Sequence, residues 1–190
     1  MSNAADTDTT TKLRVAILVA EGFEQVEMTK PREALERAGA RTVLISPEKG
    51  QVLAFNHHDK GDRFPVDVAL DDADADDYDA LLLPGGALNP DTLRTLPNAV
   101  EFVRSFFDDA KPVAAICHAP ILLIEAGVVE GRTLTSYPSI QTDLRNAGAT
   151  WVDEEVHVEN GLTTSRSPED LAAFNAAIIR EFSAVSHAYV

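Results

Sequence analysis

Four short apolar runs along the chain do not alternate with polar residues. They cover residues 14–19, 42–45, 80–83 and 113–116. A strand that is buried on one face alternates between apolar and polar side chains, whereas a strand buried on both faces is apolar throughout. The four runs therefore predict strands of a parallel sheet that is covered on both sides.

Helical patterns separate these runs. After Pro97, apolar side chains recur at the spacing of one helix face, namely at Ala99, Phe102, Val103, Phe106, Phe107 and Ala110. A final helix is predicted from about residue 167, with a buried stripe of Leu171, Phe174, Ile178 and Phe182. A shorter helix is predicted between Pro138 and Gly148. Strands that alternate with helices predict a three-layer α/β sandwich with right-handed crossovers.

The net charge narrows the possible partners. The 190 residues include 31 acidic and 16 basic side chains, which gives a formal net charge of -15. Phosphate backbones and anionic lipid surfaces repel such a chain, so we expect it to bind neither nucleic acid nor membranes. The sequence has no apolar run long enough to span a bilayer and no signal-peptide pattern at its start. We therefore expect a soluble cytoplasmic protein.

We expect one domain at residues 12–184, preceded by a disordered tail at residues 1–11 and followed by a C-terminal tail at residues 185–190. The acidic stretch at residues 71–79 is interpreted as a solvated connection to the strand at residues 80–83.

Cys117 is the single cysteine of the chain, so an intrachain disulfide and a cysteine-cluster metal site are both excluded. It directly follows the strand at residues 113–116 and precedes an apolar segment that predicts a buried helix. A thiol in front of a helix N-terminus faces free N–H groups, which favour the thiolate. Cys117 is therefore either a nucleophile or a small buried apolar residue, and this segment alone leaves both interpretations open.

Two further loops follow predicted strands and should reach the same edge of the sheet. Gly85 and Gly86 allow a close approach of the backbone, and with the N–H of His118 they could form an oxyanion hole. The loop after the first strand carries three acids, Glu21, Glu24 and Glu27. One of them could hydrogen bond with Cys117, but their positions do not show which.

Five motifs together resemble the DJ-1/PfpI superfamily of stress proteins, which are relatives of the class I glutamine amidotransferases. The motifs are A-E-G-F-E-Q-V-E at residues 20–27, L-L-L-P-G-G at 81–86, A-I-C-H-A-P at 115–120, T-S-Y-P-S-I at 135–140 and S-R-S-P-E-D-L at 165–171. The resemblance implies a flavodoxin-like sandwich with Cys117 on a nucleophile elbow. It also implies that Glu24 hydrogen bonds with the sulfur, and that Gly86 and His118 donate to an oxyanion.

The resemblance further implies that His118 is the partner of the cysteine and that an acid from the second subunit of a homodimer orients it. The matching position is Asp91, where the founding protease has a glutamate and a loop that is one residue shorter. Asp91 could instead cap the helical turn that follows it at residues 92–94.

Three other groups of residues carry weaker signals. His157-Val158-Glu159 resembles the His-x-Glu pair of amidotransferases, although the corresponding region of PfpI-like proteins is an ordinary strand. His57-His58-Asp59 has side chains that could bind a metal, but a polar hairpin loop explains it better. His187 lies in the C-terminal tail.

The resemblance implies a stress-response enzyme that acts on reactive carbonyls such as methylglyoxal, as a glyoxalase or protein deglycase. Cys117 would add to the aldehyde, Glu24 or His118 would move protons, and no cofactor or metal would be needed. The expected substrates are small aldehydes or glycated proteins. Alternatives are a peptidase that uses Cys117, His118 and Asp91, a redox sensor or chaperone without turnover, and a glutaminase that uses His157.

Overall fold

The computed structural model of the protein describes residues 13–185. The tail predicted for residues 1–11 lies outside the described residues, as do His187 and the other residues after 185. The strands are β1 (Arg14–Leu18), β2 (Phe23–Glu24), β3 (Arg41–Ser46), β4 (Gln51–Asn56), β5 (Asp59–Pro65), β6 (Val68–Ala69), β7 (Ala80–Leu83), β8 (Val113–Ile116), β9 (Thr133–Leu134), β10 (Thr150–Trp151), β11 (Val156–Glu159) and β12 (Leu162–Ser165).

The helices alternate with these strands along most of the chain. They are α1 (Gln25–Arg37), α2 (Leu88–Leu93), α3 (Pro97–Asp108), α4 (Pro120–Glu125), α5 (Gln141–Asn146) and α6 (Leu171–Val185). Short 3-10 turns add η1 (Leu70–Asp72), η2 (Ala75–Asp77), η3 (Pro138–Ile140) and η4 (Pro168–Asp170). The final helix therefore begins after a 3-10 turn, slightly later than the sequence predicts.

The largest sheet within residues 13–185 has seven strands in the order β11, β12, β8, β7, β1, β3 and β6. Neighbouring strands are parallel, except that β11 is antiparallel to β12. The four predicted apolar runs form β1, β3, β7 and β8, which confirms this prediction. Because β7 lies between β1 and β8, the loops that follow these three strands meet at one edge of the sheet.

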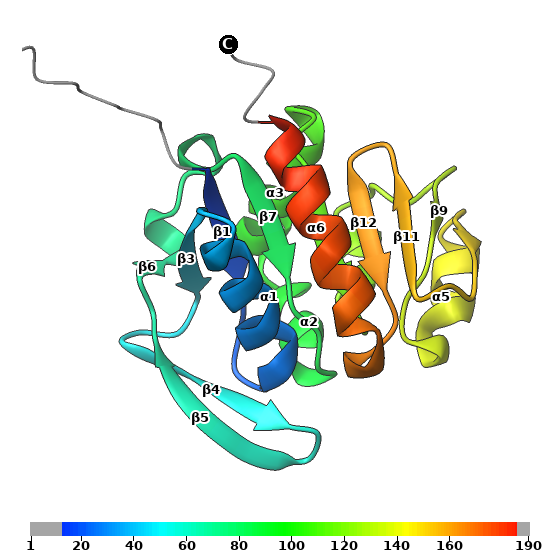
Figure 1. Ribbon diagram of the computed structural model, residues 1–190. Coiled ribbons are helices and arrows are strands. Elements are labelled where there is room, and N and C mark those ends of the chain that lie inside the picture. Colours follow the sequence, from blue (N-terminus) through cyan, green and yellow to red (C-terminus); the bar gives the residue numbers. More distant parts are fainter. Residues whose placement is uncertain (1–12, 186–190) are drawn as a thin grey trace, which may run out of the picture.

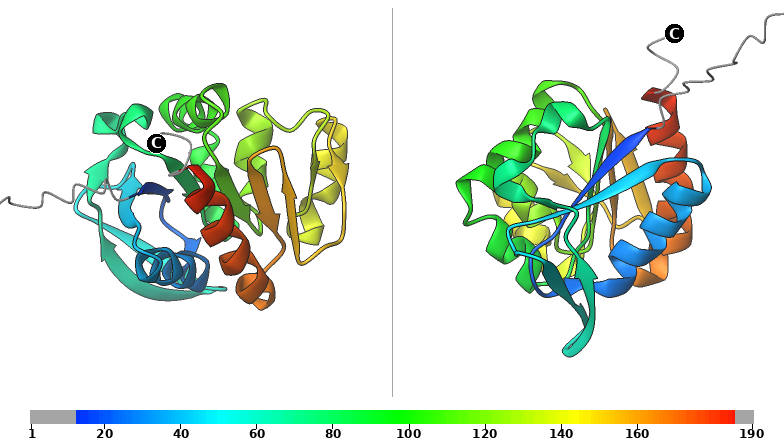
Figure 2. Two further views of the ribbon diagram at one scale, coloured as in Figure 1. Left: turned by 45° about the horizontal axis from the view of Figure 1, so that its top comes forward. Right: turned by 90° about the vertical axis from the view of Figure 1, so that its left-hand side faces the viewer.

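Helices cover both faces of this sheet, with α1 and α6 on one side and α3 on the other (Figure 1, Figure 2). Successive residues of a strand point to opposite faces. In β1, Val15 and Ile17 pack with residues of α1 and α6, whereas Ala16 and Leu18 pack with residues of α3 and α4. The predicted three-layer α/β sandwich with a mainly parallel sheet is therefore confirmed.

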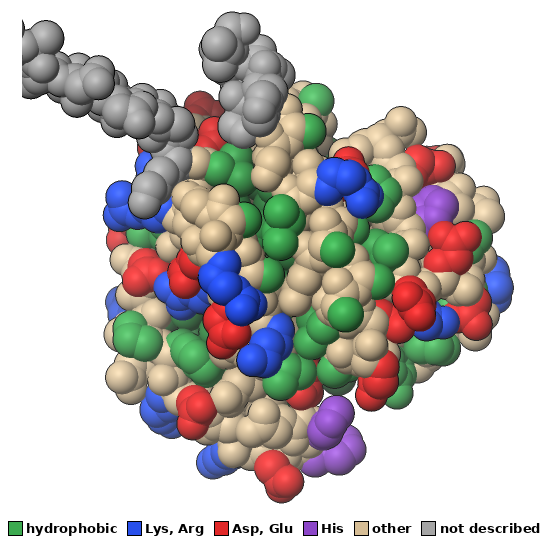
Figure 3. All heavy atoms as spheres, in the orientation of Figure 1, with side chains coloured by type: hydrophobic (Ala, Val, Ile, Leu, Met, Phe, Trp, Pro, Cys, Tyr) green, Lys and Arg blue, Asp and Glu red, His purple; other side chains and the backbone are tan. Residues whose placement is uncertain are grey.

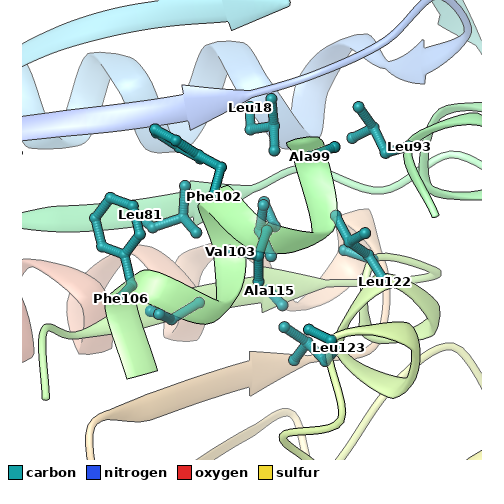
Figure 4. Close-up of a cluster of buried hydrophobic side chains, with 14 of the residues drawn as sticks. Leu18, Leu81, Leu93, Ala99, Phe102, Val103, Phe106, Ala115, Leu122 and Leu123 are labelled. Carbon is teal, nitrogen blue, oxygen red and sulfur yellow. The ribbon is translucent and has the colours of Figure 1, made fainter. Parts of the chain in front are cut away.

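The face covered by α3 holds the larger of the two apolar clusters (Figure 4). Phe102 and Phe106 lie one turn apart on α3, and their rings contact each other edge to face with centroids 5.3 Å apart. Both belong to the same buried cluster as Leu81 of β7 and Ala115 of β8. This packing holds β7 and β8 side by side, and the loops after these strands carry the candidate site residues.

Two segments outside the central sheet match their predictions. The acidic residues 71–79 are mostly exposed and form the turns η1 and η2 before β7. His57 and His58 lie in the turn of the antiparallel hairpin formed by β4 and β5, which projects beyond the sheet in Figure 1. Within the described part of the chain, no helix is long and apolar enough to span a bilayer.

Candidate active site

Cys117 directly follows the last residue of β8 and has a positive backbone φ of 64°. Residues other than glycine rarely adopt this left-handed conformation, so neighbouring groups must hold it. The Cys117 N–H donates to the carbonyl of Ser165 on β12 at 3.0 Å, and the N–H of Tyr137 donates to the Cys117 carbonyl at 2.9 Å. The turn thus places the sulfur at the edge of the sheet, in front of α4.

The glycine loop after β7 lies beside this turn because β7 and β8 are neighbours. A Cβ atom on Gly85 would lie 2.6 Å from the Cβ of Cys117, a contact too close for any side chain. The backbone N–H groups of Gly86 and His118 hydrogen bond with the Cys117 sulfur. The N–H of Gly85 donates instead to the carboxyl group of Glu27 at 2.9 Å. Gly85 is therefore not a free oxyanion donor, which corrects the prediction, whereas Gly86 and His118 lie where such donors are needed.

Asn89, which was not predicted as a site residue, connects the glycine loop to the end of β1 by hydrogen bonds. Its side chain is buried, accepts the N–H of Ala20 at 2.7 Å, and donates to the carbonyls of Pro84 and Gly85 at 2.9 and 3.0 Å. A single polar residue in a loop carries no periodic signal, so the sequence pattern could not indicate this role.

The carboxyl group that contacts Cys117 belongs to Glu27 and not to Glu24, so the predicted contact is wrong. Glu27 lies in the first turn of α1, is fully buried, and is a hydrogen-bond partner of the thiol. Glu24 lies three residues earlier, in the strand β2 that precedes α1, and its carboxyl group accepts the N–H of His57 at 3.0 Å. Glu24 thus holds the β4–β5 hairpin against the site, and the position within the loop decides which acid faces the sulfur.

Burial determines which groups of the site carry a proton at neutral pH. Desolvation raises the pKa of Glu27 from 4.5 to about 8, so Glu27 is protonated at neutral pH. Burial also raises the pKa of Cys117, and a negative charge on Glu27 raises it further, while the N–H groups of Gly86 and His118 act in the opposite direction. Burial lowers the pKa of the His118 ring below its ordinary value of 6.5, so the ring is neutral at neutral pH.

The His118 ring contacts three groups. Its Nδ1 lies 3.2 Å from the Cys117 sulfur, and its Nε2 lies 3.2 Å from the hydroxyl of Ser139. One face of the ring stacks on Tyr137 with centroids 4.6 Å apart. A neutral imidazole in this position can accept the thiol proton.

The pocket in front of Cys117 has a volume of about 660 Å³. It is lined by Glu24, Glu27, His57, His58, Gly86, Ala87, Cys117, His118, Tyr137, Pro138, Asp153, Arg166, Ser167, Pro168 and Glu169. The sequence pattern does not indicate a role for His57 and His58 at this site, because a hairpin outside the central sheet brings them to the pocket. Figure 3 shows histidine side chains exposed at the lower edge of the molecule, over this hairpin.

Arg166 forms part of the pocket wall, a role that was not predicted from the sequence. Its guanidinium group donates two hydrogen bonds to Asp170, at 2.7 and 2.9 Å, and one to Asp153 at 2.7 Å. These bonds raise the pKa of Arg166 and join the end of β12 to η4 and to the loop before β11. The motif S-R-S-P-E-D-L contains both Arg166 and its partner Asp170, but the second partner, Asp153, is distant in sequence.

Asp91 does not line the pocket that contains His118 of the same chain. It is in the first turn of α2, which begins at Leu88, so Asp91 does not occupy the N-cap position of that helix. It lines a separate surface hollow together with Arg94, Arg104 and Glu125. The contact across a subunit interface stays a prediction.

His157 does not line the Cys117 pocket. It lies on β11, as expected for an ordinary strand, and its Nδ1 is 2.8 Å from the carboxyl group of Glu154. Within residues 13–185, no group of three or more His, Cys, Asp or Glu side chains is arranged to hold a metal ion.

Comparisons with known proteins find a matching family and similar proteins over most of the chain. A sequence profile described as the DJ-1/PfpI family matches residues 13–181. "Putative cysteine protease YraA" of Bacillus subtilis is 44% identical over 162 residues, which cover 85% of this chain and 94% of that protein. "General stress protein 18" of the same organism is 43% identical over 163 residues, which cover 85% of this chain and 93% of that protein.

Solved structures share the fold. A two-domain protein from Anabaena variabilis, with DJ-1/ThiJ/PfpI-like and ferritin-like domains, matches with a TM-score of 0.84 and 35% identity. The match covers 90% of this chain and 48% of that chain, so this chain spans about half of that protein. DJ-1 of Schizosaccharomyces pombe matches with a TM-score of 0.79 and 23% identity over 93% of this chain and 98% of that chain.

Glu27→Gln should change how stability depends on pH. The folded-state pKa of Glu27 is raised from 4.5 to about 8, so the stability contributed by the neutral acid is complete below about pH 4.5 and is lost as the pH rises through 8. Between pH 5 and pH 9, the free energy of unfolding of the wild-type protein should therefore fall relative to that of Glu27→Gln, by at most about 5 kcal/mol. Urea denaturation at several pH values measures this difference.

Glu21→Gln is the matched control, because Glu21 is an exposed acid of the same loop. The difference between wild type and this control should stay nearly constant over the same range. A constant difference for Glu27→Gln as well would show that Glu27 does not retain its proton.

Proposed function

The chain belongs to the DJ-1/PfpI family, and we propose that it is a cysteine-dependent enzyme that converts small reactive dicarbonyls, such as methylglyoxal, into hydroxy acids. The proposal rests on one arrangement: the Cys117 sulfur in a pocket, surrounded by two backbone N–H groups, a protonated carboxyl group and a neutral imidazole. This set provides a nucleophile, stabilisation for an oxyanion, an acid and a base. The same chemistry would release carbonyl adducts from glycated proteins.

The first step forms the bond between sulfur and carbon. The Nδ1 atom of His118 takes the thiol proton from 3.2 Å, and the sulfur attacks the aldehyde carbon. The electron pair of the C=O bond moves to the aldehyde oxygen, where the N–H groups of Gly86 and His118 stabilise the negative charge. Glu27 then gives its proton to this oxygen, which produces a hemithioacetal and a carboxylate.

The second step moves a proton between the two carbons of the dicarbonyl. The Glu27 carboxylate removes the proton from the carbon that bears sulfur, and the neighbouring carbonyl oxygen takes the proton held by the His118 imidazolium, which gives an enediol. Glu27 then returns its proton to the neighbouring carbon, while the hydroxyl on the sulfur-bearing carbon loses its proton to the Glu27 carboxylate, which yields a thioester of a 2-hydroxy acid and restores neutral His118 and protonated Glu27. Water hydrolyses this thioester and restores the thiol, so methylglyoxal and water give lactate without an oxidant or reductant.

Two other functions use the same sulfur. Peptidase activity is supported by the name of the relative that is 44% identical and by the contact between Cys117 and His118. A role as a redox sensor or chaperone in stress is supported by the name of general stress protein 18. We favour the carbonyl reaction because the buried acid beside the sulfur supplies a proton donor at the position where the aldehyde oxygen develops charge.

Cys117→Ser should abolish turnover of methylglyoxal, with a loss of at least about 100-fold, because a hydroxyl group lacks thiolate character. Lactate release by the wild type and the variant measures this, with casein cleavage and peroxide oxidation assayed in parallel. Casein cleavage without lactate release would favour the peptidase, and oxidation of Cys117 without either turnover would favour the sensor.

A pair of histidine variants provides the matched control for this experiment. His118→Ala should lower turnover strongly, whereas His157→Ala should leave it within about twofold, because the His157 ring bonds with Glu154 outside the pocket. The reverse order would support the amidotransferase-like arrangement.

We also propose that the protein forms a homodimer in which Asp91 of one subunit orients His118 of the other. Mixing Cys117→Ser with Asp91→Ala subunits should then restore part of the activity that each variant lacks, because one site of each mixed dimer is intact. Activity is measured on mixed dimers purified by two different affinity tags. No recovery in these dimers would exclude a role of Asp91 across the interface.

A further inference from the structure

The far side of the His118 ring has a partner in the same chain. The Nε2 atom lies 3.2 Å from the hydroxyl of Ser139, while Nδ1 lies at the same distance from the Cys117 sulfur. We propose that Ser139 is a positioning residue, which orients His118 and stabilises its protonated form during catalysis. This inference rests on the proposed function only in taking Cys117 as the nucleophile.

The backbone around Ser139 is tied to the cysteine turn. The N–H of Tyr137 donates to the Cys117 carbonyl at 2.9 Å, and the N–H of Ile140 donates to the Tyr137 carbonyl at 3.2 Å. The side chain of Ile140 is buried in the core. The turn η3 therefore presents the Ser139 hydroxyl at a defined place relative to the sulfur, although Ser139 itself is exposed.

A second set of bonds holds the same segment from the other side. The indole N–H of Trp151 donates to the hydroxyl of Ser136 at 2.9 Å, and that hydroxyl donates to the Tyr137 carbonyl at 2.9 Å. The N–H of Thr135 donates to the hydroxyl of Thr164 at 3.0 Å, in the buried part of the segment. These bonds fix the path of the chain that leads to Ser139.

The chemistry of a hydroxyl group suits both protonation states of the ring. When Nδ1 is ready to accept the thiol proton, Nε2 carries a hydrogen and donates it to the Ser139 oxygen. After proton transfer, both nitrogens carry hydrogens, and the thiolate and Ser139 accept them. Without Ser139, the second N–H of the imidazolium would have only water as a partner, so the ion pair with the thiolate would form less readily.

No carboxyl group takes this place within residues 13–185, where the hydrogen bonds of the His118 ring go to Cys117 and Ser139. The hydroxyl keeps one hydrogen of its own. An acid from a second subunit could accept this hydrogen without displacing the ring, so the role of Ser139 does not depend on Asp91.

The rate at which iodoacetamide alkylates Cys117 tests this role independently of any substrate. Ser139→Ala should slow alkylation at neutral pH by about fivefold, which corresponds to about 1 kcal/mol, and should move the rate profile by about 0.7 pH unit to higher pH. Ser139→Thr keeps the hydroxyl and should restore the wild-type rate and profile. Ser105→Ala, on α3 outside the pocket, is the matched control and should behave as the wild type.

The profile must be compared between variants that share every other ionisable group of the pocket. These groups are Glu24 on β2, Glu27 on α1, His57 and His58 in the hairpin turn, Tyr137 before η3, Asp153 before β11, Arg166 after β12 and Glu169 on η4. All of them are the same in the wild type and the three variants, so a shift in Ser139→Ala alone reports on the His118 partner.

Steady-state turnover then separates the two proposals. If methylglyoxal is a substrate, Ser139→Ala should lower kcat by a similar factor and leave KM unchanged. Slower alkylation without any turnover in the wild type would support Ser139 and reject the proposed function. Alkylation at the wild-type rate and profile in Ser139→Ala, or at the alanine rate in Ser139→Thr, would overturn the role of the hydroxyl.

Discussion

A carboxyl group without access to water is the centre of this site. Glu27 is fully buried in the first turn of α1, where it accepts the N–H of Gly85 and contacts the sulfur of Cys117. Burial of an ionised carboxylate is costly, so the group keeps its proton up to a pH of about 8. The proton makes Glu27 a donor toward the sulfur or a bound oxygen, and the removal of that proton makes it a base in the same place.

The fold explains how three separate segments reach this carboxyl group. The order β8, β7, β1 brings the cysteine turn, the glycine loop and the start of α1 to one edge of the sheet. Gly85 is required because a side chain there would collide with Cys117, and Asn89 holds the glycine loop to the end of β1. The apolar cluster that α3 forms with β7 and β8 supports the strands from which the cysteine turn and the glycine loop extend.

The sequence predicts the sheet, the layers and the cysteine turn because continuous apolar runs and helix stripes are local patterns. It also predicts that Gly86 and His118 lie close together at the site, since they follow β7 and β8, which are neighbours in the parallel sheet. Which of Glu24 and Glu27 contacts the Cys117 sulfur depends on where α1 begins, and the sequence pattern does not define that residue closely enough. The helix begins at Gln25, which places Glu27 toward the sulfur. The roles of Asn89 and Ser139 could not be predicted from the sequence. Each residue acts through a small number of hydrogen bonds, and such bonds produce no periodic pattern in the sequence.

Infrared spectroscopy tests the central role of the Glu27 proton most directly. The difference spectrum between the wild type and Glu27→Gln at neutral pH should contain the carbonyl stretch of a protonated carboxylic acid, and this band should disappear as the pH rises through about 8. A difference spectrum with only carboxylate bands at neutral pH would show that Glu27 is ionised beside the sulfur, and would contradict its role as a proton donor in this site.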